Sequence, residues 1–192
     1  RQLGVAVNLY LGDHQGLYPG LNDGSAPGIQ IAWHAQLAPY LGATNQDGTP
    51  HEFIEVANCP SATHYGESPY GDSKNTRSYA LNLFAFPDIR KLSDEGPKPD
   101  AFRTLKIERP SELIIMADAG QPDQYQGWAW PYFVFGAGTT PDQVIPAGFF
   151  RGAGTEEPSF SPRHNDRGNV LFADGHVESF ELGQMKVKNV RP

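Results

Sequence analysis

An Asp-Gly pair near the end of the chain, Asp174-Gly175, constrains the fold more than any other feature of the sequence. It separates two short runs rich in β-branched and aromatic residues, residues 169–173 (NVLFA) and 176–180 (HVESF). A type I′ turn needs positive φ at both central residues, and glycine adopts positive φ at no steric cost. The pattern therefore predicts a β-hairpin with a two-residue turn at this pair.

Three side chains able to bind a metal ion or form strong hydrogen bonds surround this hairpin: His164, Asp174 and His176. We expect them to meet near one end of the hairpin. In one interpretation, His164 bonds Asp174 or a backbone carbonyl and locks the turn. In the other, these residues and Asp118 bind a divalent metal ion such as Zn²⁺, for which imidazole and carboxylate are suitable ligands. The sequence favours the lock, because it contains no HExxH motif.

The composition indicates one loop-rich domain. The 192 residues include 21 Gly and 17 Pro, about a fifth of the chain, whereas average proteins contain about 12%. The net charge is −7 and no cluster of Lys and Arg occurs. A nucleic-acid partner is excluded on this basis, because binding to the phosphate backbone requires such a cluster.

Cys59 is the only cysteine, so the chain has neither an internal disulfide nor a CxxC metal motif. We expect it to be a small buried residue, since free cysteine is among the most buried residue types. No apolar run reaches the roughly 18 residues that a membrane-spanning helix needs. The chain begins at Arg1 without a Met, inside a helical pattern, and we interpret it as a trimmed fragment.

The spacing of apolar residues predicts the remaining elements. Leu3, Val7 and Leu11 form a helical stripe within residues 1–14. Residues 29–41 suggest a second short helix that Pro39 kinks or closes. Strands are predicted at 52–56, at 77–83 and at 113–117, the last of these a buried strand that ends at Asp118.

Three aromatic residues alternate with smaller ones in the long segment between residues 120 and 160: Trp128, Trp130 and Tyr132. On an extended chain they would share one face, where they could stack on the apolar faces of a sugar. The alternative is that they cap the core beneath a long loop, because aromatic side chains carry a large buried area. The sequence favours core packing and leaves the glycan platform as the second interpretation.

His164, nine intervening residues and Asp174-Gly175 resemble the C-terminal signature of the prepilin-type H-x9-DG family of pilin-like proteins. Together with the run LFADGHV and its place near the C-terminus, this match is fairly specific. Further blocks similar to the family's pattern cover about half of the chain: residues 1–19, Trp33 with 37–41 (LAPYL), 59–61 (CPS), 78–82 (SYALN) and 110–118. The segment 120–160 has no counterpart, because family members vary there.

The resemblance implies an α+β, pilin-like fold in which a long N-terminal helix packs on an antiparallel sheet that ends in a C-terminal hairpin. The chain would be one domain, 1–192, with residues 1–15 as the remainder of the helix, 119–160 as a variable insertion and 161–181 as the signature hairpin. A prepilin leader and an apolar half-helix would lie upstream of Arg1. The domain would face the periplasm from an inner-membrane anchor, or lie on the cell surface.

The function implied is that of a non-enzymatic structural subunit of a type IV pilus-like or type II secretion pseudopilus-like assembly. Its partners would be other pilin-like subunits, the secretion or pilus machinery, and the membrane through the missing helix. Two alternatives stay open. One is a glycan-binding or adhesin-like module that uses Trp128, Trp130 and Tyr132. The other is a metal-dependent hydrolase that uses His164, Asp174 and His176.

Calcium is a second candidate ion beside zinc. Related pseudopilins hold calcium in a C-terminal loop, and calcium prefers oxygen ligands to imidazole. The oxygen donors to consider are Asp118, Asp123, Asn165 and Asp166, although none has EF-hand spacing. No Gly-x-Ser-x-Gly elbow supports nucleophilic catalysis.

Overall fold

The computed structural model describes residues 1–19, 33–44, 46–47, 55–61, 78–82, 107–118, 132–135, 140–144, 150–151, 160–181 and 183–190. Its helices are α1 (Gln2–Asp13) and α2 (Trp33–Leu37), with 3₁₀ turns η1 (Ala38–Leu41), η2 (Glu55–Ala57) and η7 (Val187–Asn189). Its strands are β1 (Tyr79–Asn82), β2 (Ile114–Asp118), β3 (Tyr132–Phe135), β4 (Phe150–Arg151), β5 (Arg167–Phe172) and β6 (Val177–Glu181).

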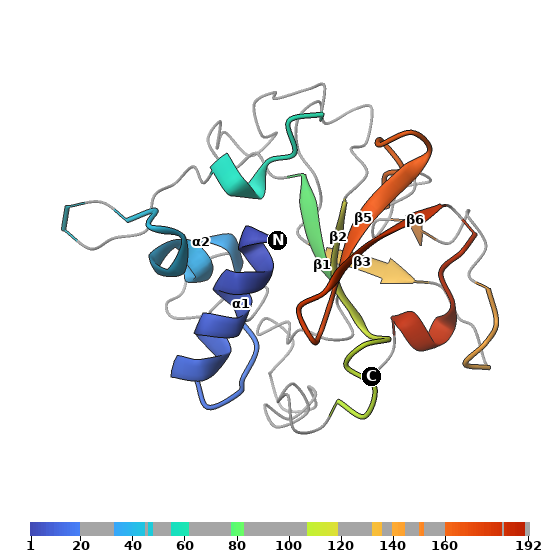
Figure 1. Ribbon diagram of the computed structural model, residues 1–192, viewed down its shortest axis with the longest axis horizontal. Coiled ribbons are helices and arrows are strands. Elements are labelled where there is room, and N and C mark those ends of the chain that lie inside the picture. Colours follow the sequence, from blue (N-terminus) through green and yellow to red (C-terminus); the bar gives the residue numbers. More distant parts are fainter. Residues whose placement is uncertain are drawn as a thin grey trace.

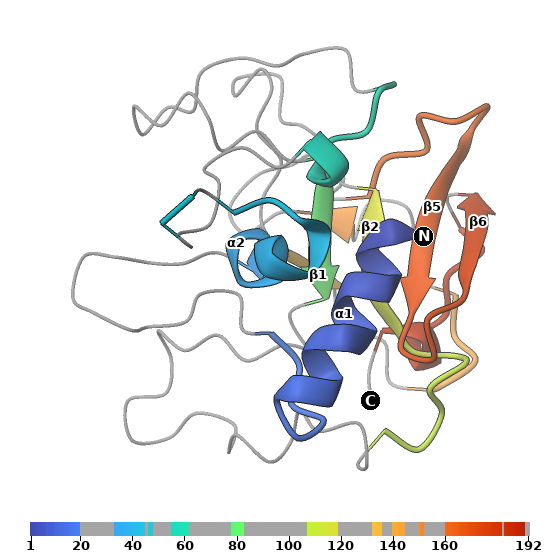
Figure 2. The ribbon, with the colours of Figure 1, turned by 60° about the vertical axis from the view of Figure 1, so that its left-hand side comes forward.

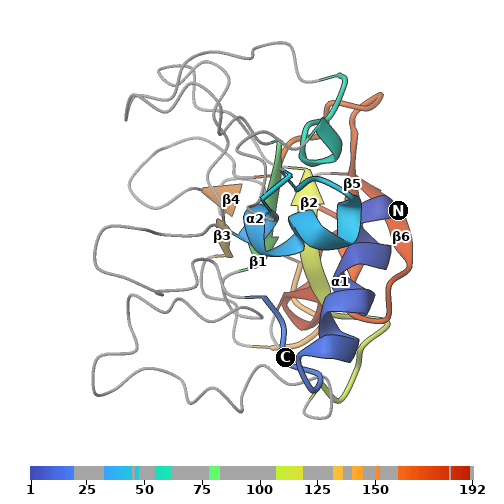
Figure 3. The ribbon, with the colours of Figure 1, turned by 90° about the vertical axis from the view of Figure 1, so that its left-hand side faces the viewer.

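The strands form one sheet in the order β4-β3-β1-β2-β5-β6. Neighbouring strands are antiparallel, except that β3 is parallel to β1. The predicted α+β class is therefore confirmed. β2 is buried at every position, which the apolar run 113–117 predicts for an inner strand. Figure 3 shows β3 and β4 at the edge of the sheet away from α1.

Helix α1 packs along one face of the sheet (Figure 2). Leu3, Val7 and Leu11 are buried in this interface, so the stripe predicted from the sequence is the face that contacts the core. Gly4 brings the helix close to β5, because a Cβ there would lie 2.9 Å from Leu171 Cδ1. No helix among the described residues has both the length and the apolar character needed to cross a membrane.

Pro39 explains how the second helical segment ends. The α-helical turn α2 gives way at residue 38 to the 3₁₀ turn η1, which has Pro39 in its first turn and ends at Gly42 with φ 67°. The helix predicted at 29–41 is confirmed as helical structure over 33–41; residues 29–32 lie outside the described residues. A proline here removes an α-helical hydrogen bond, which favours the tighter turn.

The strand predicted at 52–56 is wrong where the structure describes it. Glu55 and Val56 belong to the 3₁₀ turn η2, and residues 52–54 lie outside the described part of the chain. The turn places Ala57 in the core beside α1 and packs Val56 against it. A single 3₁₀ turn therefore packs Val56 and Ala57 into the core, although the alternation of apolar and polar residues predicts a strand here.

β5 and β6 pair antiparallel from Arg167–Glu181 to Leu171–Val177. The connection differs from the predicted type I′ turn, because Gly175 has φ 92° whereas Asp174 does not have a positive φ. Gly175 N–H donates to the Phe172 carbonyl at 2.9 Å, and Phe172 N–H donates to the His176 carbonyl at 2.9 Å. These bonds close a three-residue loop, which requires positive φ at its glycine alone.

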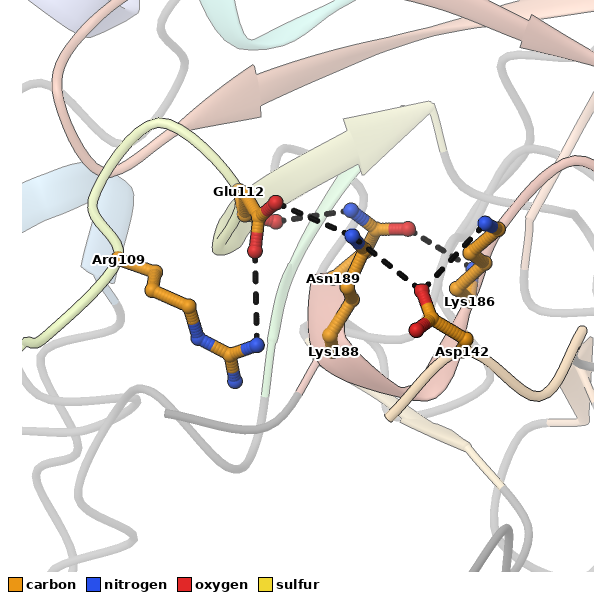
Figure 4. A network of polar contacts seen from close by, with 6 residues as sticks. All are labelled: Arg109, Glu112, Asp142, Lys186, Lys188 and Asn189. Atoms are coloured by element: carbon orange, nitrogen blue, oxygen red, sulfur yellow. Dashed lines mark hydrogen bonds and ion pairs between the residues drawn. The ribbon is translucent and has the colours of Figure 1, made fainter. Parts of the chain in front are cut away.

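The C-terminal segment, residues 183–190, covers the opposite face of the sheet from α1 (Figure 1). Phe160 and buried side chains from β1, β2, β5 and this segment form a second core, to which the segment contributes Met185 and Val190. Polar contacts at the surface join this segment to the rest of the chain (Figure 4). Lys188 Nζ donates a hydrogen bond to Glu112 at 3.1 Å, and Lys186 Nζ lies 3.5 Å from Asp142 Oδ1.

Candidate functional site

The structure separates the residues that the sequence grouped around the hairpin. His164 lies just before β5, whereas Asp174 and His176 lie just after it, at the hairpin loop. The six residues of β5 extend for about 20 Å at the usual rise of about 3.3 Å per residue. The prediction that His164, Asp174 and His176 meet at one end is therefore wrong. Asp118 and His164, in contrast, do meet.

The sheet topology explains which residues converge. β1 and β2 are antiparallel with Tyr79 opposite Asp118, so β1 begins where β2 ends. β5 is also antiparallel to β2 and begins at the same end. The segment before β1 returns to this place as well, because Cys59 N–H donates a hydrogen bond to Ser78 Oγ. Three segments far apart in sequence thus meet at the end of β2.

A tight turn aims His164 at this meeting point. His164 and Arg167 exchange backbone hydrogen bonds, with N···O distances of 2.8 and 3.1 Å. The two residues between them, Asn165 and Asp166, have φ 52° and 62°. Positive φ at both central positions is the type I′ arrangement, and Asn and Asp tolerate it better than most residues. These two candidate calcium donors are exposed at the tip of this turn, and Asp123 lies outside the described residues.

Cys59, Asp118 and His164 form the candidate site. His164 Nε2 lies 3.3 Å from Asp118 Oδ2 and 3.4 Å from Cys59 Sγ. One ligand atom from each of the three residues lies within 4.8 Å of the other two. The expectation that Cys59 is buried is confirmed, since its exposed fraction is 1%. Its place beside a histidine and a carboxylate was not expected.

Asp118 is the most buried of the three, with an exposed fraction of 0%. Its Oδ2 accepts hydrogen bonds from Asn169, at 2.6 Å from the backbone N and 3.1 Å from Nδ2. No described residue donates a hydrogen bond to its Oδ1. Burial raises the pKa of the carboxyl group, although the Asn169 hydrogen bonds and the charges of Arg163 and His164 oppose the rise.

Tyr79 lies against the same group. Burial raises the pKa of its hydroxyl well above the usual value, and the neighbouring Asp118 and Cys59 side chains raise it further, while Arg163 opposes them. The phenol is therefore neutral at physiological pH. It can serve as a hydrogen-bond donor to the cluster and adds no charge to it.

The cluster does not have the geometry of a nucleophilic triad. In such a triad the nucleophile approaches one ring nitrogen of the histidine and the carboxylate approaches the other. Here both Cys59 Sγ and Asp118 Oδ2 approach Nε2 of His164. The three side chains point toward a common centre and do not form a relay.

The hairpin loop is locked by a different pair from the one predicted. Asp174 Oδ1 accepts from His176 N–H at 3.1 Å and lies 2.5 Å from His176 Nδ1. The His176 ring also stacks on Phe172, with centroids 4.1 Å apart. Partial burial acts to raise the pKa of Asp174, but the hydrogen bonds from His176 outweigh it and leave the pKa below its usual value. His164 takes no part in this lock.

A cavity of about 650 Å³ lies beside the cluster, between the start of α1 and the sheet. Its wall includes Asn58 and Pro60, which flank Cys59, and Asn169, which hydrogen-bonds Asp118. The predicted aromatic platform lies mostly outside the described residues. Trp128 and Trp130 are not described, and of Tyr132 only the backbone, in β3, is described.

Comparisons with known proteins identify no relative: no family model, no curated protein and no solved structure matches this chain.

Proposed function

We propose that the chain is a non-enzymatic structural subunit of a type IV pilus-like or type II secretion pseudopilus-like assembly. In this proposal α1 continues upstream into an apolar helix, which anchors the subunit in the inner membrane and then packs with the helices of other subunits in a fibre. The α+β domain faces the periplasm or the exterior. Its partners are other pilin-like subunits and the machinery that assembles them.

The observation that carries this proposal is a pair of exposed apolar side chains on α1. Val5 is 59% exposed and Leu9 is 51% exposed. They lie one helical turn apart, on the face opposite to the buried Leu3 and Val7. Among the described residues the only other exposed large hydrophobic side chain is that of Val144, at 47%.

Helix α1 thus packs one apolar side on its own sheet and presents two further apolar side chains, Val5 and Leu9, on its outer side among the exposed Gln2, Asn8 and Asp13. A surface helix usually presents charged and polar residues on its outer face, and an apolar outer face favours contact with another protein surface. The same pattern is what a helix needs when it packs on its own domain and on the helices of neighbouring subunits. The resemblance of 164–175 to the H-x9-DG signature supports the same conclusion.

Photo-crosslinking in the full-length gene product, expressed in its native cell, tests this proposal. A photoreactive residue at Val5 or Leu9 should give products at multiples of the mass of this chain, or of this chain with another pilin-like subunit. A photoreactive residue at Glu178, which is 58% exposed on β6, serves as the control and should give far fewer. Monomer alone from Val5 and Leu9 would overturn the proposal.

A charge substitution provides a second test. Leu9→Glu should abolish the crosslinked multimers, because a carboxylate would be buried between helices without a partner. The same substitution should leave the Tm of the isolated domain nearly unchanged, because residue 9 is exposed there. A matching loss of Tm and multimers would instead assign Leu9 to the fold of the domain.

A further inference from the structure

The geometry points to a metal site that goes beyond the assembly function: we propose that Cys59, Asp118 and His164 bind a divalent first-row transition metal ion, with Zn²⁺ the best fit. A thiolate, an imidazole and a carboxylate are the three side-chain types that zinc sites in proteins use. The three residues come from three separate segments of the chain, and their ligand atoms converge on one point.

Two of the three distances between the ligand atoms match those of a tetrahedral site. Zinc is bound at about 2.3 Å by sulfur and at about 2.0 to 2.2 Å by nitrogen and oxygen. A tetrahedron with those bond lengths has edges of about 3.3 to 3.6 Å between ligand atoms. The two distances from His164 Nε2, 3.3 Å to Asp118 Oδ2 and 3.4 Å to Cys59 Sγ, are such edges. The third distance, between the ligand atoms of Asp118 and Cys59, is below 4.8 Å, so an ion would draw these two atoms together where they are farther apart than such an edge.

The charges of the ligands also suit a divalent cation. A fully buried carboxylate is costly unless a cation or a full set of hydrogen bonds compensates it. Asp118 receives hydrogen bonds at Oδ2 but none from a described residue at Oδ1. One carboxylate and one thiolate together neutralise a divalent cation. Calcium fits this set poorly, because sulfur and imidazole are not among its ligands.

Backbone and side-chain contacts already orient all three ligands. Asn169 holds the Asp118 carboxylate, Ser78 Oγ accepts from the backbone N–H of Cys59, and the paired hydrogen bonds to Arg167 hold the backbone of His164. Such outer contacts commonly orient metal ligands before the ion binds. These contacts would hold the three ligands in place around a bound ion.

The cavity beside the cluster is lined by neighbours of the ligand residues and would give the ion and a water ligand an entry path. Residues on both sides of Cys59 line it, as does Asn169, and the His164 side chain is 31% exposed. Three protein ligands leave one tetrahedral position for a water molecule from the cavity. Bound metal would join the segment before β1, the end of β2 and the start of β5, and so stabilise the fold by mass action.

Metal titration of the purified, chelator-treated chain tests this inference without reference to assembly. We expect one Zn²⁺ per chain, a Tm that rises with Zn²⁺ concentration, and, with Co²⁺, the absorption bands of a tetrahedral site with a thiolate ligand. Cys59→Ser, Asp118→Asn and His164→Gln should each lower the affinity at least about 100-fold, more than the loss of a ligand's supporting contact usually costs.

His176→Gln is the matched control, because it removes the histidine of the other His–Asp pair, at the hairpin loop. It should leave the affinity and the Co²⁺ spectrum unchanged. Absence of stoichiometric Zn²⁺ or Co²⁺ binding to the wild-type chain would overturn the inference whether or not the variants fold. Binding that survives Cys59→Ser with an unaltered spectrum would overturn it as well.

Discussion

The two ends of strand β2 carry ionisable side chains in opposite settings. Glu112, just before the strand, belongs to an exposed network with Arg109, Lys188 and Asp142, in which the ion-pair distances are 3.1 to 3.5 Å (Figure 4). Asp118, the last residue of the strand, is fully buried. At the Glu112 end of β2, both carboxylates of the network, Glu112 and Asp142, lie within ion-pair distance of a lysine or arginine side chain. At the second end, the described residues within hydrogen-bond or ion-pair distance of the Asp118 carboxylate are Asn169 and His164, and the charge of Arg163 also acts on it.

This difference separates two uses of charge in one fold. Exposed ion pairs contribute little free energy, because water screens them and their side chains lose freedom. A buried carboxylate without full compensation is unfavourable for stability, so its presence indicates another role. The exposed end positions the C-terminal segment, whereas the buried end has the features of a binding site. The variants below test this contrast.

The largest expected effect comes from Gly168→Ala, at the buried end. A Cβ there would lie 2.5 Å from Phe160 Cζ and 2.6 Å from the Ser161 carbonyl oxygen. That part of the chain cannot easily shift, because Ser161 N–H donates to the Asp118 carbonyl at 3.0 Å. We expect a loss of about 3 kcal/mol in the free energy of unfolding, measured with urea.

Gly12→Ala is the control, because nothing lies within 4 Å of a Cβ at that helical position. It should stabilise the chain by up to about 1 kcal/mol through helix propensity. Equal losses from the two substitutions would mean that the β5 end is not tightly packed, and the contrast between the ends would fail.

Asn82→Ala should cost about 2 kcal/mol, because it leaves buried carbonyl groups without donors. Asn82 is fully buried, and its Nδ2 donates to the Ile114 and Val190 carbonyls, both at 2.8 Å. Asn82→Leu keeps the volume but also lacks the donors, so it should lose a similar amount in urea unfolding. Full stability of the Leu variant would assign the loss to the cavity instead of the hydrogen bonds.

The parts of the fold that could be predicted are those with a local signal. The apolar run 113–117 predicts β2, and the helical stripe that includes Leu3 and Val7 predicts α1, because burial of these residues depends on their immediate neighbours in sequence. The strand predicted around Val56 is wrong because a 3₁₀ turn also packs Val56 against the core.

The candidate site could be predicted only in part. Asp118 and His164 were recognised from their residue types and from the strand that Asp118 ends. Their partner Cys59 lies 105 residues from His164 in sequence, and only the pairing of β1 with β2 brings it there. Asp174 and His176 are close to His164 in sequence, and this spacing predicts one shared site. The extended strand β5 lies between them and keeps them apart in space.

A smaller effect is expected from Asp174→Asn at the hairpin loop. Hydrogen bonds from His176 hold the pKa of Asp174 below its usual value against the effect of burial. The ionised form therefore stabilises the fold above the ordinary carboxyl pKa, and this contribution is lost as the pH falls through the lowered pKa. The variant should lose less than about 1 kcal/mol at neutral pH, since the pair is partly exposed.

The measurement is Tm against pH from neutral to acid. Wild type and variant should differ at neutral pH and converge in acid. Glu108→Gln, which removes one exposed carboxylate elsewhere, is the control and should leave the Tm at neutral pH nearly unchanged. A constant difference at every pH would show that His176 does not stabilise the ionised carboxylate.

The smallest effect is expected from Asp142→Asn, at the exposed end. The hydrogen bond from Lys188, and the charges of Lys188 and Lys186, lower the pKa of Asp142, but its side chain is 75% exposed. The Tm at neutral pH should change by little more than the error of measurement. Any difference should vanish at about 1 M salt, where the Debye length falls to about 3 Å. A salt-resistant loss as large as that of Asn82→Ala would mean that the exposed network stabilises the C-terminal segment as strongly as buried hydrogen bonds do, and that exposure alone does not distinguish the two ends of β2.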